Sequence, residues 1–516
     1  MKRTKTSFTS MSTASTATDN LSAPSRRTLL KAGALGAGAL ALGTNAVAQV
    51  FSPGLKQGRE RGITPYALVD RTSFGLSLKE MNLYDQLGWN GYLERQLNPR
   101  AIDDTKCLAR LNQFETVNYT PYQVLKWTSD GVNADWECIQ STIIRSLYTD
   151  RQLLEVMTEF WMNHFSVYIY NVNRELLPEF IRTIRNNALG KFSTLLSVVT
   201  KSPAMLQYLD NLNNTKGNSN QNFAREFLEL HSIGVDGGYS EADVRLLAKI
   251  FTGWGMEGYY EWPWDQTTNP NWGRFKFYAE YHDDVGGYFM GNNPANLIPK
   301  GGVVQGDTVI QRVATSMACA KFISTKLLRK FVTYNPSQAL IDATAQVFIS
   351  SSGNITSVLR YILDENRFRQ NQTTKLKRPF HLVCSGIRAL EGEVTDADSL
   401  TWELFYNMKQ IPLWWAPPNG YPDALDAWVD NLRPRWYFGF QLPLNWLWNT
   451  RVDIFSKFKS KDRDTVVDAI NGLLFGGGLP KFRREELKAF MPQKPTNDQI
   501  RDVFGLALAS PEFQVY

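Results

Sequence analysis

The chain has 516 residues, of which 43% are hydrophobic and 21% charged. This composition supports a large buried core and excludes a disordered or fibrous protein. The formal charge of +6 comes mainly from residues 1–48, which hold six Lys or Arg against a single Asp and so carry +5. About +1 is left for residues 49–516, too little for the basic surface that a phosphate backbone requires. We therefore expect no nucleic-acid partner.

The four cysteines do not have the spacing of a thiolate metal site. No two of them form a C-x-x-C pair or a zinc-ligand pattern. Outside the cytoplasm one or two disulfides would form, whereas buried thiols would act as small apolar residues, and the sequence leaves both alternatives open. The cysteines are Cys107, Cys138, Cys319 and Cys384.

Residues 1–48 have the three parts of a secretory leader. A basic run that contains Arg26 and Arg27 precedes a short stretch of Ala, Gly and Leu, and small residues follow at 46–48. Adjacent arginines are typical of the twin-arginine export signal. We predict cleavage after residue 48 and a periplasmic or secreted location; the alternative is an uncleaved anchor. No other apolar run reaches 18 residues, so no permanent membrane span is expected.

Helical periodicity dominates the mature chain, which we predict to be one large domain over 49–516. Residues 222–230 place Phe223 and Phe227 on one apolar stripe. A second helix is predicted to begin at Ser240, whose hydroxyl caps it together with Asp243. Similar patterns occupy Leu153–Phe165, Arg174–Leu189, Ala318–Val332, Pro336–Ser350 and Arg483–Phe490.

Two aromatic-rich loops interrupt the helices. Residues 255–299 are predicted as a long irregular insertion with a small hairpin at 273–281, and 412–422 form the second loop. The aromatic residues of 259–265 and Trp414-Trp415 offer flat faces to the rings of a saccharide polymer, or else they pin the loops to the core. We predict a mainly α-helical fold with long aromatic-rich loop insertions and little β-structure.

A series of short motifs, in a fixed order, extends over nearly the whole mature chain. They are DRTSFG at 70–75, FWMNHF at 160–165, MLQYLDN at 205–211, NFAREFLELH at 222–231, FTGW at 251–254, His282-Asp283, Lys326-Leu327, KRP at 377–379, PNGYP at 418–422 with Trp428, and SPEF at 510–513. In these motifs the chain resembles the bacterial family called domain of unknown function 1800. One departure is Asn220-Gln221-Asn222, where the family often has Asn-Glu-Asn.

The resemblance implies a mainly helical exported protein, and it supplies no established chemistry. Members of the family are often encoded beside a second exported family, domain of unknown function 1501, which is similar to the alkaline phosphatase and sulfatase group. By resemblance, a co-exported protein of that kind is a candidate partner.

The densest group of chemically active residues is the stretch 225–231. Glu226 and Glu229 are three residues apart and share a helix face, where paired carboxylates can hold a divalent cation or act as acid and base. His231 joins them only if the helix ends at Leu230. The alternative is structural: Arg225 pairs with Glu229, Glu226 pairs with another helix and His231 stabilises the helix end.

The remaining candidates are two histidines and an aspartate. His164 lies in an aromatic helix beside Asn163, where a hydrogen-bonded core residue is the alternative to a metal ligand. His282 and Asp283 lie in the long loop, where they can converge on a cation or simply form a turn. We predict a site with His164, His231 and His282 as ligands of Zn, Fe or Mn, and with Glu226, Glu229 and Asp283 as catalytic residues.

The leading functional prediction is an exported, metal-assisted hydrolase that acts on an envelope or extracellular polymer. The alternative is a non-catalytic binding or assembly protein that works with a co-exported phosphatase-like or sulfatase-like partner. A redox protein is a third class, but the chain has no haem or flavin motif. The substrate, the metal and the oligomeric state do not follow from the sequence.

Overall fold

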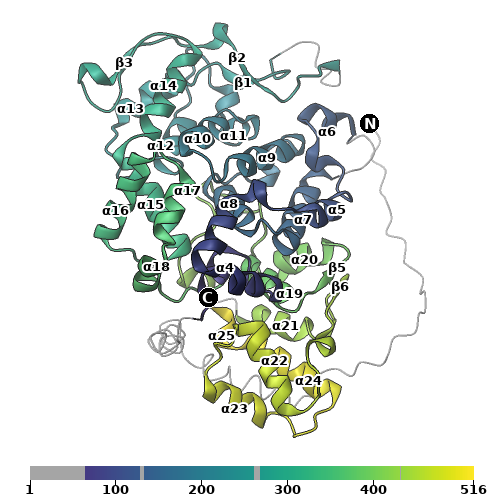
Figure 1. Ribbon diagram of the computed structural model, residues 1–516. Coiled ribbons are helices and arrows are strands. Elements are labelled where there is room, and N and C mark those ends of the chain that lie inside the picture. Colours follow the sequence, from purple (N-terminus) through teal and green to yellow (C-terminus); the bar gives the residue numbers. More distant parts are fainter. Residues whose placement is uncertain (1–63, 128–132, 261–267, 430–431) are drawn as a thin grey trace.

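The computed structural model describes residues 64–127, 133–260, 268–429 and 432–516. The predicted leader and residues 261–265 of the first aromatic motif lie outside these ranges. The described chain is mainly α-helical with only short strand pairs, as the sequence predicts. In Figure 1, helices α21–α25 gather at the lower end and strands β1–β3 at the upper end, with α7, α8 and α9 between them.

The first half of the chain supplies the central helices. They are α3 (Ala67–Thr72), α4 (Leu78–Leu97), α5 (Thr105–Leu111), α6 (Pro121–Trp127), α7 (Ala134–Tyr148), α8 (Gln152–His164), α9 (Leu177–Asn187), α10 (Phe192–Thr200), α11 (Pro203–Tyr208), α12 (Gln221–Glu229) and α13 (Glu241–Ile250). Helix α8 packs against α4, α7 and α9, so its side chains are central to the core.

The second half adds a lateral group of helices and a C-terminal group. They are α14 (Val303–Ala314), α15 (Met317–Phe331), α16 (Gln338–Ser350), α17 (Ile355–Ile362), α18 (Glu365–Asn371), α19 (Pro379–Ala389), α20 (Asp398–Trp402), α21 (Leu432–Gln441), α22 (Arg463–Phe475), α23 (Lys481–Ala489), α24 (Asn497–Ala509) and α25 (Pro511–Gln514). Helix α15 packs along α16, and α21 packs along α24.

Among the described residues, the strands form three antiparallel pairs of two or three residues each. They are β1 (Trp254–Met256) with β2 (Phe275–Phe277), β3 (Gly287–Tyr288) with β4 (Leu297–Ile298), and β5 (Glu393–Val394) with β6 (Thr450–Arg451). The predicted local hairpin at 273–281 is therefore wrong in its partner, because β2 pairs with a strand that directly follows α13.

Local signals explain several helix ends. Ser240 and Asp243 form the predicted capping box of α13, in which each side chain bonds the main-chain N–H of the other residue. Thr496 and Gln499 form a second capping box on α24. These bonds satisfy N–H groups that a helix start otherwise leaves without acceptors.

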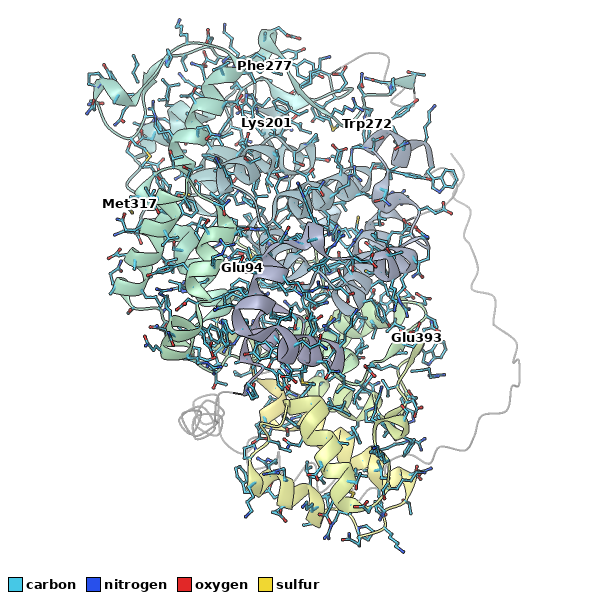
Figure 2. All side chains as sticks on the ribbon, viewed as in Figure 1. Glu94, Lys201, Trp272, Phe277, Met317 and Glu393 are labelled. Atoms are coloured by element: carbon cyan, nitrogen blue, oxygen red, sulfur yellow. The ribbon has the colours of Figure 1, made fainter. Side chains whose placement is uncertain are left out.

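One continuous cluster of buried apolar side chains extends from Leu68 to Phe513. Figure 2 shows side chains filling the space between the helices, with Phe277 and Trp272 at the end that carries strands β1–β3. All four cysteines are buried and free, so the apolar alternative holds for them. Within the described residues, no helix is long and apolar enough to cross a membrane.

Candidate functional site

His164 is the last residue of α8, and its imidazole is buried. Its Nε2 lies 3.0 Å from the main-chain oxygen of His231, and its Nδ1 lies 2.9 Å from Nζ of Lys326. Because a carbonyl oxygen only accepts hydrogen bonds, these contacts assign the ring proton to Nε2. Burial and, secondly, the charge of Lys326 hold the pKa of His164 well below its ordinary value. The ring is therefore neutral at pH 7.

His231 follows the C-terminal end of α12. Its amide donates to the carbonyl oxygen of Glu226, and the chain then turns at Gly234, whose φ is +81°. The turn brings the ring to His164, with 6.2 Å between the two ring centroids. Burial lowers the pKa of His231 to about 3. Its buried Nε2 has no hydrogen-bond partner among the described residues, an uncommon state for a polar atom.

Lys326, on α15, completes this group and is absent from the predicted site residues. Burial lowers its pKa to about 8, against the opposing charge of Asp423. Within the described ranges Lys326 forms no ion pair with a carboxylate, and its side chain keeps part of its surface exposed. Such a lysine can serve as a base, a nucleophile or an anion-binding group. We call Lys326, His164 and His231 the lysine–histidine cluster.

The loop 412–422 is fastened to the end of α8 beside this cluster. Asn163 Nδ2 donates to the carbonyl oxygen of Tyr421, and Asn163 Oδ1 accepts from the Tyr421 amide at 2.7 Å. The side chain of Tyr421, within the loop, packs with Leu376 and Trp428 in a small second core. The Asn163 side-chain amide, next to His164 in the chain, thus positions the aromatic loop.

The two predicted carboxylates form a separate group on α12. Glu229 Oε1 accepts from the Tyr239 hydroxyl at 2.6 Å and lies 3.5 Å from Arg225, which also pairs with Glu241. Burial and, secondly, the charge of Glu229 raise the pKa of Glu226. No hydrogen bond or ion pair between described residues joins either carboxylate to a histidine. The Arg225–Glu229 pair is the structural alternative, and the catalytic role of the two carboxylates stays a prediction.

The third group of predicted site residues, His282 and Asp283, lies in the loop after β2. The buried ring of His282 places Nδ1 2.9 Å from the main-chain oxygen of Thr252 and Nε2 3.0 Å from Oε1 of Gln305. The Asp283 amide donates to the Thr252 hydroxyl at 2.7 Å. These bonds tie the insertion to the ends of α13 and α14. Both ring nitrogens are engaged, and the roles of His282 and Asp283 as ligand and catalyst stay predictions.

The structure therefore brings His164 and His231 together and keeps Glu226 with Glu229, and His282 with Asp283, in two other places. Among the residues with described positions, no three His, Cys, Asp or Glu side chains are grouped so as to hold a metal ion. Catalytic zinc sites use three protein ligands. The lysine–histidine cluster, with two histidines, does not fit a Zn, Fe or Mn centre of that kind.

Aromatic side chains gather where α7, the 412–422 loop and the end of α20 meet. Trp136 lies 5.4 Å from Trp402 and 5.7 Å from Trp414, measured between ring centroids. Tyr170 packs on Trp414, and Tyr406 stacks on Trp402. Tyr170 is 61% exposed and Tyr406 57% exposed. We call these five residues the aromatic cluster.

Comparison with known proteins adds a family and no activity. A family model described as protein of unknown function (DUF1800) matches residues 67–515, nearly all of the described chain. No curated protein and no solved structure matches.

Proposed function

We propose, for a chain that belongs to the DUF1800 family of proteins of unknown function, that it is an exported hydrolase whose general base is Lys326. The observation that carries the proposal is the contact of Lys326 Nζ with His164 Nδ1 at a partly buried position, where no described carboxylate forms an ion pair with the lysine. A lysine in this environment is better explained by a catalytic role than by a stabilising one, because a buried cation without an ion-pair partner destabilises the fold.

The contact with His164 also orients the lysine. His164 is held by its bond to the His231 carbonyl oxygen, so its Nδ1 lone pair faces one Nζ–H of Lys326 at a fixed position. In the neutral amine this bond leaves the Nζ lone pair free to accept a proton from water or from a hydroxyl group. That proton transfer is general-base catalysis, for which a pKa near the working pH is best.

We also propose where the protein acts and on which class of substrate. The twin-arginine pattern within residues 1–48 supports work outside the cytoplasm. There, an envelope or extracellular polymer is the substrate class that we propose. The loop 412–422, hydrogen-bonded to Asn163 next to His164, would form one wall of the substrate's path to Lys326.

Lysine reactivity and hydrolysis, measured on the same samples, test the proposal. The rate at which acetic anhydride acetylates Lys326, followed by peptide mass spectrometry, is expected to reach half its maximum near pH 8. Release of soluble fragments from purified peptidoglycan and bacterial exopolysaccharide is expected to rise with pH to a plateau above 8. Lys326→Met and Lys326→Arg should lose about 10²–10⁴-fold of that activity. Lys321→Met, which removes an exposed lysine of α15, is the control. Wild-type rates in Lys326→Met would contradict the proposal.

A second candidate function, saccharide binding without catalysis, is favoured by the aromatic cluster. Exposed Trp and Tyr rings present the flat apolar faces on which sugar rings pack. Asp398 accepts from the Trp402 indole N–H at 3.1 Å and so fixes one of these rings at the surface.

Sedimentation with insoluble polysaccharide separates this function from the first. Tyr170→Ala and Trp402→Ala are expected to reduce the bound fraction of protein, whereas Phe482→Ala, which removes a 54% exposed aromatic ring from α23, should not. Unchanged binding in both cluster variants would exclude the aromatic cluster as the binding surface.

A further inference from the structure

Five arginines line a cavity whose described lining includes no residue of the lysine–histidine cluster. The cavity has a volume of about 740 Å³ and lies between the C-terminal end of α4, helices α7 and α9 and the start of α8. The described residues that line it include no Asp or Glu. The arginines are Arg100, Arg145, Arg151, Arg182 and Arg185.

The contacts of these arginines leave most of their charge without a counter-ion. Arg151 donates to the main-chain oxygen of Ile102, and Arg182 donates to those of Val117 and Tyr119. Carbonyl oxygens position a guanidinium group and carry no negative charge. Arg182 also lies 3.9 Å from a carboxylate oxygen of Glu179, at the outer limit of an ion pair.

Arg185 is the one lining arginine with a close carboxylate partner in the described chain. Its Nε lies 2.9 Å and 3.1 Å from the two oxygens of the buried Glu155. This pair uses only Nε, so both terminal nitrogens of Arg185 can bind a further anion.

Arg145 gives the clearest indication of an anion site, because its side chain has no partner in the described chain. It lies on α7, mostly buried, and no described residue forms a hydrogen bond or an ion pair with its side chain. Burial and, secondly, the charge of Arg185 lower the pKa of Arg145. A bound anion would remove this unfavourable pairing of two cations.

We propose that the cavity binds an acidic saccharide, a sugar that carries carboxylate, phosphate or sulfate groups. The guanidinium fork bonds such oxyanions in pairs. The exposed amides of Asn98, Asn118 and Asn186 lie among the lining residues and can bond sugar hydroxyls. The volume lies within the range of about 300–1,000 Å³ that ligand cavities usually have.

The site is separate from the proposed hydrolytic centre. Arg151 precedes the first residue of α8 and His164 is the last, so the 13-residue helix separates these two residues by about 20 Å. Binding here does not depend on the chemistry of Lys326.

Titration calorimetry with three anionic probes and a neutral one tests the proposal. The probes are oligogalacturonate for carboxylate, fructose 1,6-bisphosphate for phosphate, a heparin tetrasaccharide for sulfate, and maltohexaose as the neutral sugar. We expect at least one anionic probe to bind, with an affinity that falls as salt increases, and no binding of maltohexaose. The probe that binds best identifies the anionic group.

Three variants localise the binding. Arg145→Gln and Arg100→Gln are expected to weaken it at least tenfold, and Arg145→Lys to weaken it less than Arg145→Gln because the charge is kept. Arg245→Gln removes an exposed arginine of α13 and is the control of equal charge. Arg100 is exposed, so its variant carries the test if Arg145→Gln fails to fold. Absence of binding by all three anions at millimolar concentration would overturn the proposal. Wild-type affinity in both single variants, Arg100→Gln and a folded Arg145→Gln, would overturn it as well.

Discussion

Gly420 approaches the end of α8 so closely that a Cβ atom at this position would lie 2.1 Å from the main-chain oxygen of Asn163. Its φ of +72° is also one that residues with a side chain rarely adopt. The PNGYP turn therefore requires glycine for two independent reasons, and this turn holds the aromatic loop beside His164.

Gly420→Ala is accordingly expected to detach the 412–422 loop. Strain and the lost contacts should lower the free energy of unfolding by about 1–3 kcal/mol. Hydrogen exchange of the loop amides, read by mass spectrometry, should accelerate. The matched control is Gly472→Ala in α22, where a Cβ meets no atom within 4 Å and alanine should stabilise the helix by up to about 1 kcal/mol. Equal loop exchange in Gly420→Ala and wild type would show that the turn tolerates a Cβ.

Lys326→Met is expected to stabilise the protein at pH 7. The pKa of Lys326 is about 8 in the fold and about 10.4 in an unfolded chain. The unfolded chain thus binds more protons between these values, and wild-type stability rises with pH through that window. Below pH 8 the buried charge costs on the order of 2 kcal/mol, which the methionine variant does not lose.

Urea unfolding at pH 7 and pH 10 measures this effect. The advantage of Lys326→Met should shrink at the higher pH, while Lys321→Met should stay within about 0.5 kcal/mol of wild type at both. A variant that is less stable than wild type at pH 7 would assign Lys326 a structural role.

Sequence patterns predict those features of this protein that depend on neighbours in the chain. The capping box of Ser240 and Asp243 is local, and the structure confirms it. The contact between His164 and Lys326 joins residues 162 positions apart, and no spacing rule marks it. The Lys326-Leu327 motif gave the only signal for this residue, but its chemistry appears only when α15 packs near α8. The partner of β2 is non-local in the same way.

The buried histidines should make the protein sensitive to acid. Burial lowers the pKa of His231 to about 3 and that of His381 well below its ordinary value. Below about pH 6.5 the unfolded chain therefore takes up protons that the folded chain does not bind, and stability falls as the pH falls. At pH 5 each such histidine should contribute a loss of about 2 kcal/mol relative to pH 7.5.

His231→Gln isolates one of these contributions. The difference in unfolding free energy between pH 7.5 and pH 5 should be about 2 kcal/mol smaller in this variant than in wild type. His381→Gln should give a similar reduction. A pH dependence identical to wild type in both variants would mean that the two imidazoles have the same pKa in the folded and unfolded chains, and so would contradict their burial as neutral groups.

The carboxylate of Glu159 is the counter-ion of two buried cations. It lies 3.0 Å from Nζ of Lys330 and 2.6 Å from a terminal nitrogen of Arg378. Burial raises its pKa, yet the charges of Arg378 and Lys330 hold that pKa below its ordinary value. The stabilisation from this group is thus present above about pH 4.3 and is lost as the pH falls through the pKa of the folded state.

Glu159→Gln should lower the free energy of unfolding by about 3–5 kcal/mol at pH 7, because it leaves two buried cations without a counter-ion. Glu94→Gln is the surface control. Glu94, labelled in Figure 2, pairs with Arg360 at an exposed position, and its loss should cost less than about 1 kcal/mol.

Loss of Glu159 should also change the titration of Lys326, because Lys330 lies one helical turn from Lys326 on α15. Without its counter-ion, the charge of Lys330 disfavours the ammonium form of Lys326. The acetylation midpoint of Lys326 should therefore fall below pH 8 in Glu159→Gln. An unchanged midpoint would show that the two lysines titrate independently.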